Sequence, residues 1–197
     1  VLFDEPLTVI DPHLKWQLRR KLKQIHHELK LTLIYVTHDQ IEALTFADEV
    51  VVMSRGRAVQ VGTAEALFER PEHTFVGHFI GSPGMNFLPA KGEGGAVRVL
   101  DRLLPVPGRQ LPPGELRLGI RPEYLDIGLE GEAGSLPARV GRVQDIGTST
   151  MVTCEAGGHL LKVRLAAERH APAVGDTVHL RLIDTHTCFY QDERLIP

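Results

Sequence analysis

The chain has 197 residues, a hydrophobic content of 43% and a formal net charge of −3, a composition typical of a globular protein that buries a core. No run approaches the roughly 20 apolar residues of a membrane span, and acids slightly outnumber bases in both halves. We therefore expect no nucleic-acid binding and no direct membrane insertion. Cys154 and Cys188 lack metal-binding spacing and are expected to be reduced thiols, with a disulfide as the alternative.

The first segment begins inside an apolar run, Val1-Leu2-Phe3, without a methionine, so we expect a piece of a longer protein. Asp11-Pro12 then predicts a helix start, with Asp as the N-cap and Pro at the first helical position. The following helix carries one apolar stripe at spacings of three and four, made of Leu14, Leu18, Leu22, Ile25 and Leu29. Residues 32–36 form an apolar, β-branched run, which is typical of a parallel strand covered on both faces.

The next elements continue an α/β pattern. A short helix is expected over residues 40–46, and residues 50–53 and 58–61 predict a hairpin around residues 54–57. Two short helices follow Thr63 and end near Gly81. We interpret residues 1–81 as an α/β domain whose beginning is missing.

The character of the sequence changes at residues 81–84, where Gly and Pro begin to separate short β-like runs. Their spacing predicts a small all-β barrel or sandwich over residues 82–197. The predicted strands cover residues 96–100, 115–120, 138–143, 150–154, 160–165 and 177–183. Loops are expected at residues 91–95, 129–135 and 155–158.

Two acidic residues, Asp4 and Glu5, end the first apolar strand. The carboxyl ends of strands open onto the ligand crevice of an α/β sheet. There the first acid can hold Mg²⁺ and the second can orient a water that attacks a phosphoryl group. The alternative is a solvated strand-to-loop turn ended by Pro6.

A histidine follows the next predicted buried strand, within Thr37-His38-Asp39-Gln40. His38 should therefore emerge at the same sheet edge as Asp4 and Glu5. A histidine at a helix start is usually structural or solvated, but beside an acid pair it can contact a γ-phosphate. The acid pair and the histidine together indicate a nucleotide-hydrolysing site more strongly than either motif does alone.

Together these motifs resemble the nucleotide-binding subunits of ABC importers. The resemblance rests on Leu2–Leu7, Asp11, Tyr35–Gln40, Glu42-Ala43 and Ala47-Asp48. Gly81-Ser82-Pro83 with Met85–Leu88 is similar to the junction into the regulatory domain of the maltose and glycerol-phosphate types, and Leu118–Glu123 is similar to the TOBE signature.

The resemblance implies an α/β remnant of a P-loop NTPase domain followed by an OB-like TOBE barrel. It implies that Asp4 is the Walker B aspartate and Mg²⁺ ligand, Glu5 the catalytic glutamate and His38 the switch histidine. Thr8 to Asp11 would form the D-loop, with Asp11 and His38 among the nucleotide-binding residues. Val9 departs from that loop's usual small polar run.

The same resemblance implies ATP and Mg²⁺ as cofactors of the parent and transmembrane permease subunits as partners. For this chain we expect a homodimer, because residues 1–3 and 33–36 would leave apolar surface and unpaired strand edges exposed; the resemblance adds contacts between regulatory domains. The parent would lie in the cytoplasm, held at the inner face of the membrane by those permeases, and would power import of a sugar or a related solute.

No phosphate-binding loop G-x-x-x-x-G-K-[ST] occurs in this chain, and the ABC signature Leu-Ser-Gly-Gly-Gln is absent too. We therefore expect the chain alone neither to bind nor to hydrolyse ATP, because Asp4 and Glu5 have no phosphate cradle beside them. The alternative function is a stand-alone regulatory module that binds a partner protein or small effector without ATPase activity. An oligonucleotide-binding barrel is disfavoured because aromatic residues make up only 6% of the chain.

Several polar residues of the β region are interpreted as solvated charges rather than a ligand site: Arg121, Glu123, Asp145, Asp184 and His186. Trp16 lies off the leucine stripe and is expected to be exposed or to pack against a missing part of the domain.

Overall fold

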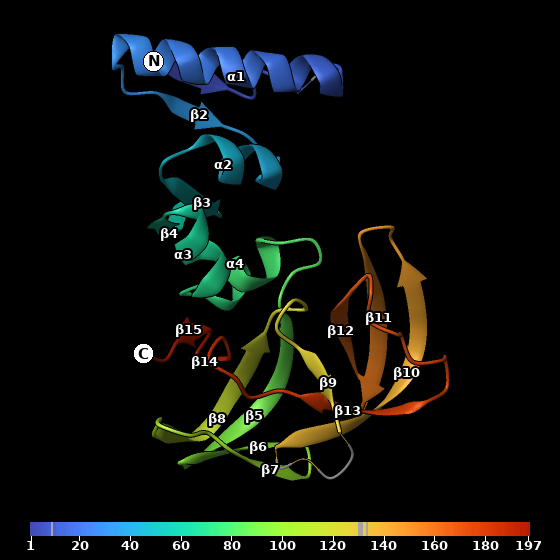
Figure 1. The fold of residues 1–197 in the computed structure, drawn as a ribbon. Helices are drawn as coiled ribbons and strands as arrows, with labels where there is room; N and C mark the ends of the chain where they lie inside the picture. The colour runs from blue at the N-terminus through green and yellow to red at the C-terminus, as the bar shows by residue number, and fades with distance from the viewer. Residues whose placement is uncertain (9, 130–131, 133) are drawn as a thin grey trace. The chain divides into compact units, whose positions relative to one another are not determined.

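The structure is a computed structural model that describes residues 1–8, 10–129, 132 and 134–197. The chain divides into two compact units, Val1–Leu67 and Phe68–Pro197, which we call the N-terminal and C-terminal units (Figure 1). The division precedes the predicted domain boundary at 81/82. Residues 68–81 belong to the second unit because they hydrogen-bond within it, as Thr74 N does to Glu193 O at 2.9 Å.

The N-terminal unit begins with a parallel pair of strands joined by a helix. Strand β1 (Leu2–Asp4) pairs with β2 (Ile34–Val36), with Leu2 opposite Ile34 and Asp4 opposite Val36. Helix α1 (Pro12–Leu29) connects them, and α2 (Gln40–Phe46) follows β2. This is one βαβ unit, as the sequence predicted.

Helix α1 starts and stops where its end residues dictate. The Asp11 carboxylate accepts from His13 N at 2.9 Å, which satisfies one of the free N–H groups of the first turn. Lys30 ends the helix in the left-handed region, with φ +49°, and its N–H bonds His26 O. The predicted helix start at Asp11 is confirmed.

The apolar faces of this unit are largely uncovered. In the leucine stripe of α1, Leu14 is 50% exposed and Leu29 61%. Residues 32–36 have the pattern of a strand covered on both faces, but in this chain one face is open: Ile34 is 58% exposed, in agreement with the expected exposed apolar surface. The described residues of the unit cover only one side of β2, on which Tyr35 is half-buried.

A hairpin and two short helices continue the chain. Strands β3 (Val50–Ser54) and β4 (Arg57–Gly62) pair around Arg55-Gly56. Both turn residues have positive φ, which is the geometry that matches strand twist in a two-residue hairpin. Helices α3 (Ala64–Glu69) and α4 (Thr74–Phe79) follow. The predicted hairpin and helices are confirmed.

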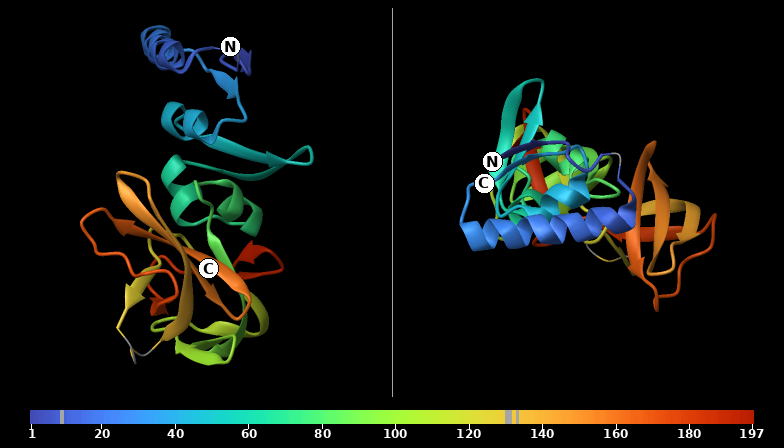
Figure 2. Two further views of the ribbon diagram at one scale, coloured as in Figure 1. Left: turned by 90° about the vertical axis from the view of Figure 1, so that its right-hand side faces the viewer. Right: turned by 90° about the horizontal axis from the view of Figure 1, so that it is seen from above.

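The described part of the C-terminal unit contains a five-stranded and a six-stranded antiparallel sheet, seen from two sides in Figure 2. The first has the order β12-β11-β10-β13-β9 and the second β15-β14-β8-β5-β6-β7. Their strands are β5 (Asn86–Gly94), β6 (Ala96–Val99), β7 (Arg102–Pro105), β8 (Leu111–Ile120), β9 (Asp126–Gly128), β10 (Ser135–Asp145), β11 (Ser149–Ala156), β12 (His159–Ala166), β13 (Thr177–Arg181), β14 (Cys188–Gln191) and β15 (Arg194–Leu195).

Alternating residues of the two sheets form one hydrophobic core, from Leu88 and Leu118 in one sheet to Val152 and Leu161 in the other. This packing of two sheets confirms the expected all-β domain. Cys154 and Cys188 are free and buried, as expected, and burial raises the pKa of the Cys154 thiol to about 11.

The prediction of a loop at residues 91–95 is wrong. Most of it is the end of β5, where Gly92 lies opposite Gly114 on β8. A Cβ at Gly92 would lie 2.0 Å from Pro112 O, so the glycine allows close strand approach rather than a turn. Of the loop expected at 129–135, residues 130, 131 and 133 lie outside the described residues, and Ser135 begins β10.

Two buried polar side chains hold the C-terminal unit together. The amide of Asn86 donates to Lys162 O and accepts from Lys162 N, both at 2.8 Å, so it pairs with the edge strand β12 as a backbone group would. Arg121 is 1% exposed, donates to Phe68 O at 2.5 Å and Ile80 O at 2.6 Å, and stacks on the Phe68 ring. Its interpretation as a solvated charge is therefore wrong.

Candidate functional site

Glu5 and His38 meet at one edge of the β1–β2 pair. Because the strands are parallel, their carboxyl ends lie side by side. Glu5 N donates to Val36 O at 2.9 Å, which continues the ladder past β1. His38 Nδ1 lies 3.0 Å from Glu5 Oε1. The expectation that both side chains emerge at this edge agrees with the structure.

The second oxygen of Glu5 also has a partner. Thr8 Oγ1 lies 3.1 Å from Glu5 Oε2 and 3.1 Å from the Glu5 carbonyl oxygen. Glu5 itself adopts φ +44°, an uncommon conformation for a residue with a side chain. The hydrogen bond with His38, followed by that with Thr8, lowers the pKa of the Glu5 carboxyl below its ordinary value. Glu5 is thus held as an ionised acid at the site.

The other two predicted site residues, Asp4 and Asp11, lie at different places in the unit. Asp4 is the last residue of β1 and is exposed at the same edge. Asp11 caps α1, and Val9 of the predicted D-loop lies outside the described residues. Within the described ranges no group of three or more His, Cys, Asp or Glu side chains could hold a metal ion by itself.

A buried network behind His38 was not foreseen from the sequence. Glu42 Oε2 lies 3.0 Å from Thr37 Oγ1 and 3.2 Å from Tyr35 Oη, and both hydroxyls donate to it. Thr37 Oγ1 also accepts from Asp39 N at 3.0 Å. Burial, followed by the charge of Glu42, raises the pKa of Tyr35 to about 12. The available signals were that Glu42 follows His38 by four residues and belongs to the motif that carries the family resemblance.

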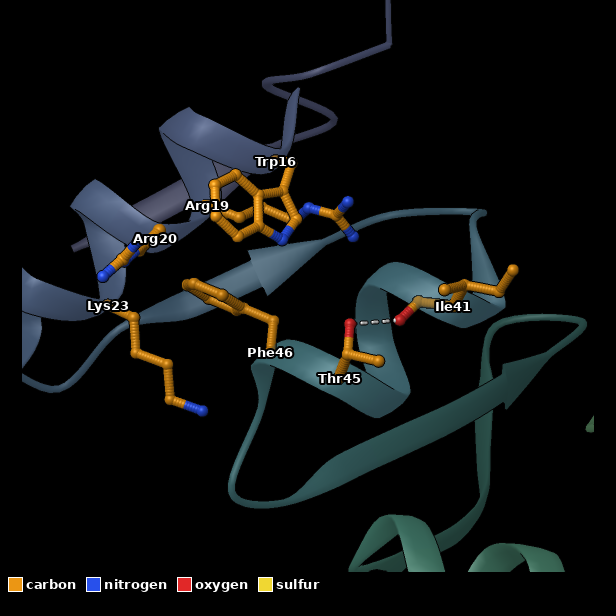
Figure 3. A pocket seen from close by; sticks show the side chains of 7 residues that line it. All are labelled: Trp16, Arg19, Arg20, Lys23, Ile41, Thr45 and Phe46. Carbon is orange, nitrogen blue, oxygen red and sulfur yellow. Dashed lines mark hydrogen bonds between the residues drawn. The ribbon is translucent and has the colours of Figure 1, made fainter. Parts of the chain in front are cut away.

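A hollow lies between α1 and α2, and Figure 3 shows its lining side chains. Its volume is about 380 Å³, and its lining residues are Trp16, Arg19, Arg20, Lys23, Ile41, Thr45 and Phe46. Trp16 is exposed, in agreement with one of its two expectations, and the Arg20 guanidinium lies 5.5 Å from its ring centroid. The cations line an open surface, so we assign the hollow no function.

Comparison with known families identifies the C-terminal unit. Residues 81–125 match the MalK OB fold domain and residues 118–189 match the TOBE domain. This region therefore has the OB-like, transport-associated fold. The structure describes no helix long and apolar enough to cross a membrane in the ranges given above.

Comparison with individual proteins extends the similarity over nearly the whole chain. An uncharacterised ABC transporter ATP-binding protein, y4oS, of Sinorhizobium fredii is 45% identical over 80% of this chain and 43% of its own length. The sn-glycerol-3-phosphate import ATP-binding protein UgpC is 38% identical in Pectobacterium atrosepticum and in Escherichia coli K12. These two matches cover 92% and 98% of this chain and 52% and 55% of the relatives.

The resemblance to ATP-binding subunits of ABC importers is thereby confirmed. The chain spans about half the length of the curated relatives that it matches.

Proposed function

We propose that this chain is part of an ATP-hydrolysing subunit that powers solute import. Residues 1–81 would be the C-terminal portion of its P-loop NTPase domain, and residues 82–197 its regulatory TOBE domain. The observation that carries the proposal is the Glu5–His38 pair, 3.0 Å apart at the ends of two adjacent parallel strands. The similarity to ATP-binding subunits supports it.

The residues at this edge fit ATP with Mg²⁺. Magnesium sites in nucleotide-hydrolysing enzymes use one or two carboxylates plus substrate phosphates rather than a cage made only of protein. The exposed carboxylate of Asp4 meets that need. The bound metal would neutralise charge on the phosphates.

Glu5 and His38 would have different roles in hydrolysis. An ionised Glu5 can accept a hydrogen bond from the attacking water and orient it. An ionised Glu5 oxygen only accepts, so His38 Nδ1 donates to it; Nε2 faces away from this bond and could donate to a phosphate oxygen in the imidazolium form of the ring. Thr8 holds the other oxygen of Glu5 and so restricts the carboxylate's rotation. Asp11 would support the loop between Thr8 and α1 by capping the helix.

The chain alone is expected to be inactive, because no phosphate-binding loop occurs in it. In the parent, permease subunits would anchor the protein at the cytoplasmic face of the membrane. The uncovered stripe of α1 and the exposed face of β2 favour association, and we propose a homodimer. A sugar or a related solute is proposed as the cargo of the parent; the UgpC relatives are named for the import of sn-glycerol-3-phosphate.

The test uses the full-length subunit that contains this sequence. Glu5→Gln should retain ATP binding and reduce turnover at least about 100-fold, because the variant removes the water-orienting carboxylate but keeps Asp4. His38→Ala should also reduce turnover. Glu49→Gln and His27→Ala are matched controls, since both residues are exposed and lie outside the site.

Turnover within twofold of the unmodified subunit in both Glu5→Gln and His38→Ala would refute these assignments. Magnesium-dependent ATP hydrolysis by the 197-residue chain alone, lost in Glu5→Gln, would refute the expectation that the chain needs a phosphate-binding loop.

A further inference from the structure

Glu42 is a buried acid to which the proposed hydrolysis gives no role. It is 3% exposed, although it belongs to the short helix α2 in a unit whose other surfaces are largely open. Its Oε1 has no hydrogen-bond partner among the described residues, and Lys15 Nζ of α1 lies 3.6 Å away. Such an acid is costly to bury, and an apolar residue of similar size often stabilises a fold at least as well. Packing alone therefore does not account for Glu42.

The contacts of Glu42 surround the backbone of His38. Its Oε2 accepts from Thr37, the residue before His38. The same Thr37 hydroxyl accepts from the N–H of Asp39, the residue after it. Asp39 in turn caps α2 by accepting from Ile41 N at 2.9 Å and Glu42 N at 3.2 Å. The N–H of the peptide unit between His38 and Asp39 is thus held in one closed set of hydrogen bonds.

A second contact ties this set to the strand below it. Tyr35 of β2 donates to the same Glu42 oxygen, and its ring packs 5.0 Å from that of Phe46 at the end of α2. The carboxylate therefore joins β2, the His38 loop, α2 and, through Lys15, helix α1. His38 itself bonds only Glu5 among the contacts that the structure gives its side chain, so its direction depends on the backbone that carries it.

We propose that Glu42 is the positioning residue of His38: its buried carboxylate fixes the Thr37–Asp39 loop so that the imidazole faces Glu5, and Lys15 holds the carboxylate from α1. Only the reason for positioning His38, its role in ATP hydrolysis, rests on the proposed function. The geometry itself can be tested in this chain without nucleotide.

The experiment replaces Glu42 by Leu, which has a similar volume and helix propensity but accepts no hydrogen bond. Amide hydrogen exchange of Asp39 and the ¹⁵N spectrum of the His38 ring are recorded in the 197-residue chain. Asp39 should exchange roughly three- to tenfold faster, the effect of losing one net hydrogen bond, and the Nδ1 signal should lose its hydrogen-bonded shift. Glu42→Gln retains an acceptor and should restore most of both signals. Glu28→Leu, an exposed glutamate of α1, is the control.

A second variant covers the case in which Glu42→Leu fails to fold. Lys15→Met removes only the cation and should shift the same two signals less strongly, while Lys21→Met, on the exposed face of α1, should not. Unchanged Asp39 exchange and an unchanged His38 ring signal in a folded Glu42→Leu or Lys15→Met chain would overturn the proposal.

In the full-length subunit, Glu42→Leu should lower kcat more than it changes KM, because a misdirected His38 affects the reaction more than binding. If the Asp39 and His38 signals change but turnover does not, the positioning is supported and the role of His38 in hydrolysis is wrong. This outcome separates failure of the proposed function from failure of the inference.

Discussion

Replacing Arg121 by Met tests how the C-terminal unit holds residues 68–81. The guanidinium lies in a site with almost no solvent exposure and donates to two main-chain carbonyls, Phe68 O at 2.5 Å and Ile80 O at 2.6 Å. These carbonyls flank α4 on both sides, and Arg121 follows β8 directly. Burial lowers the pKa of Arg121 below its ordinary value, but an arginine remains charged at neutral pH.

The expected loss of stability follows from the two carbonyl groups that lose their donor in Arg121→Met. Met fills much of the volume but donates nothing, so both carbonyls lose a charged donor in a buried site. Each orphaned carbonyl costs about 1–3 kcal/mol, and part of this sum is offset because the variant no longer buries a charge. We expect a loss of about 2–4 kcal/mol from the free energy of unfolding of the C-terminal unit. Arg121→Lys should also destabilise, because an ammonium lacks the planar fork that reaches both carbonyls.

The assay is urea unfolding, monitored by hydrogen exchange of the β8 amides. These amides report on the C-terminal unit separately from the rest of the chain. Arg117→Met, an exposed arginine on the same strand, is the matched control and should change stability by less than about 0.5 kcal/mol. A similarly small effect of Arg121→Met would refute the reasoning, since it would mean that water or neighbouring groups replace the guanidinium without loss.

Two other predictions concern packing. Asn86→Leu should destabilise the C-terminal unit by about 2 kcal/mol, because the N–H and C=O of Lys162 both lose their partner; faster exchange of the Lys162 amide checks it, and unchanged exchange would contradict it. The 197-residue chain should form a dimer, because Leu14, Leu29 and Ile34 expose apolar surface. Light scattering at micromolar concentration should then give twice the chain mass of 21.8 kDa, and a particle of 21.8 kDa would contradict the homodimer.

Local signals in the sequence were sufficient for most elements of the N-terminal unit. The Asp11 cap, the apolar run before Thr37 and the turn at Arg55-Gly56 act through neighbouring residues, and the helix, strand and hairpin lie where these signals placed them. In the C-terminal unit the glycines of residues 91–95 were misinterpreted as a loop. A glycine that ends a strand and one that lets two strands approach give the same sequence pattern, and only the contact with Pro112 distinguishes them.

The candidate site divides in the same way. The sequence by itself determined that an acid pair and a histidine follow two successive strands, because the order of elements in a βαβ unit places both strand ends at one edge. Only the tertiary structure decided that Glu5 bonds both His38 and Thr8, that Glu42 and Arg121 are buried, and that the leucine stripe of α1 is left uncovered. Burial and hydrogen bonding depend on residues distant in the chain. The sequence around a charged side chain therefore does not show whether water or a carbonyl group will solvate it.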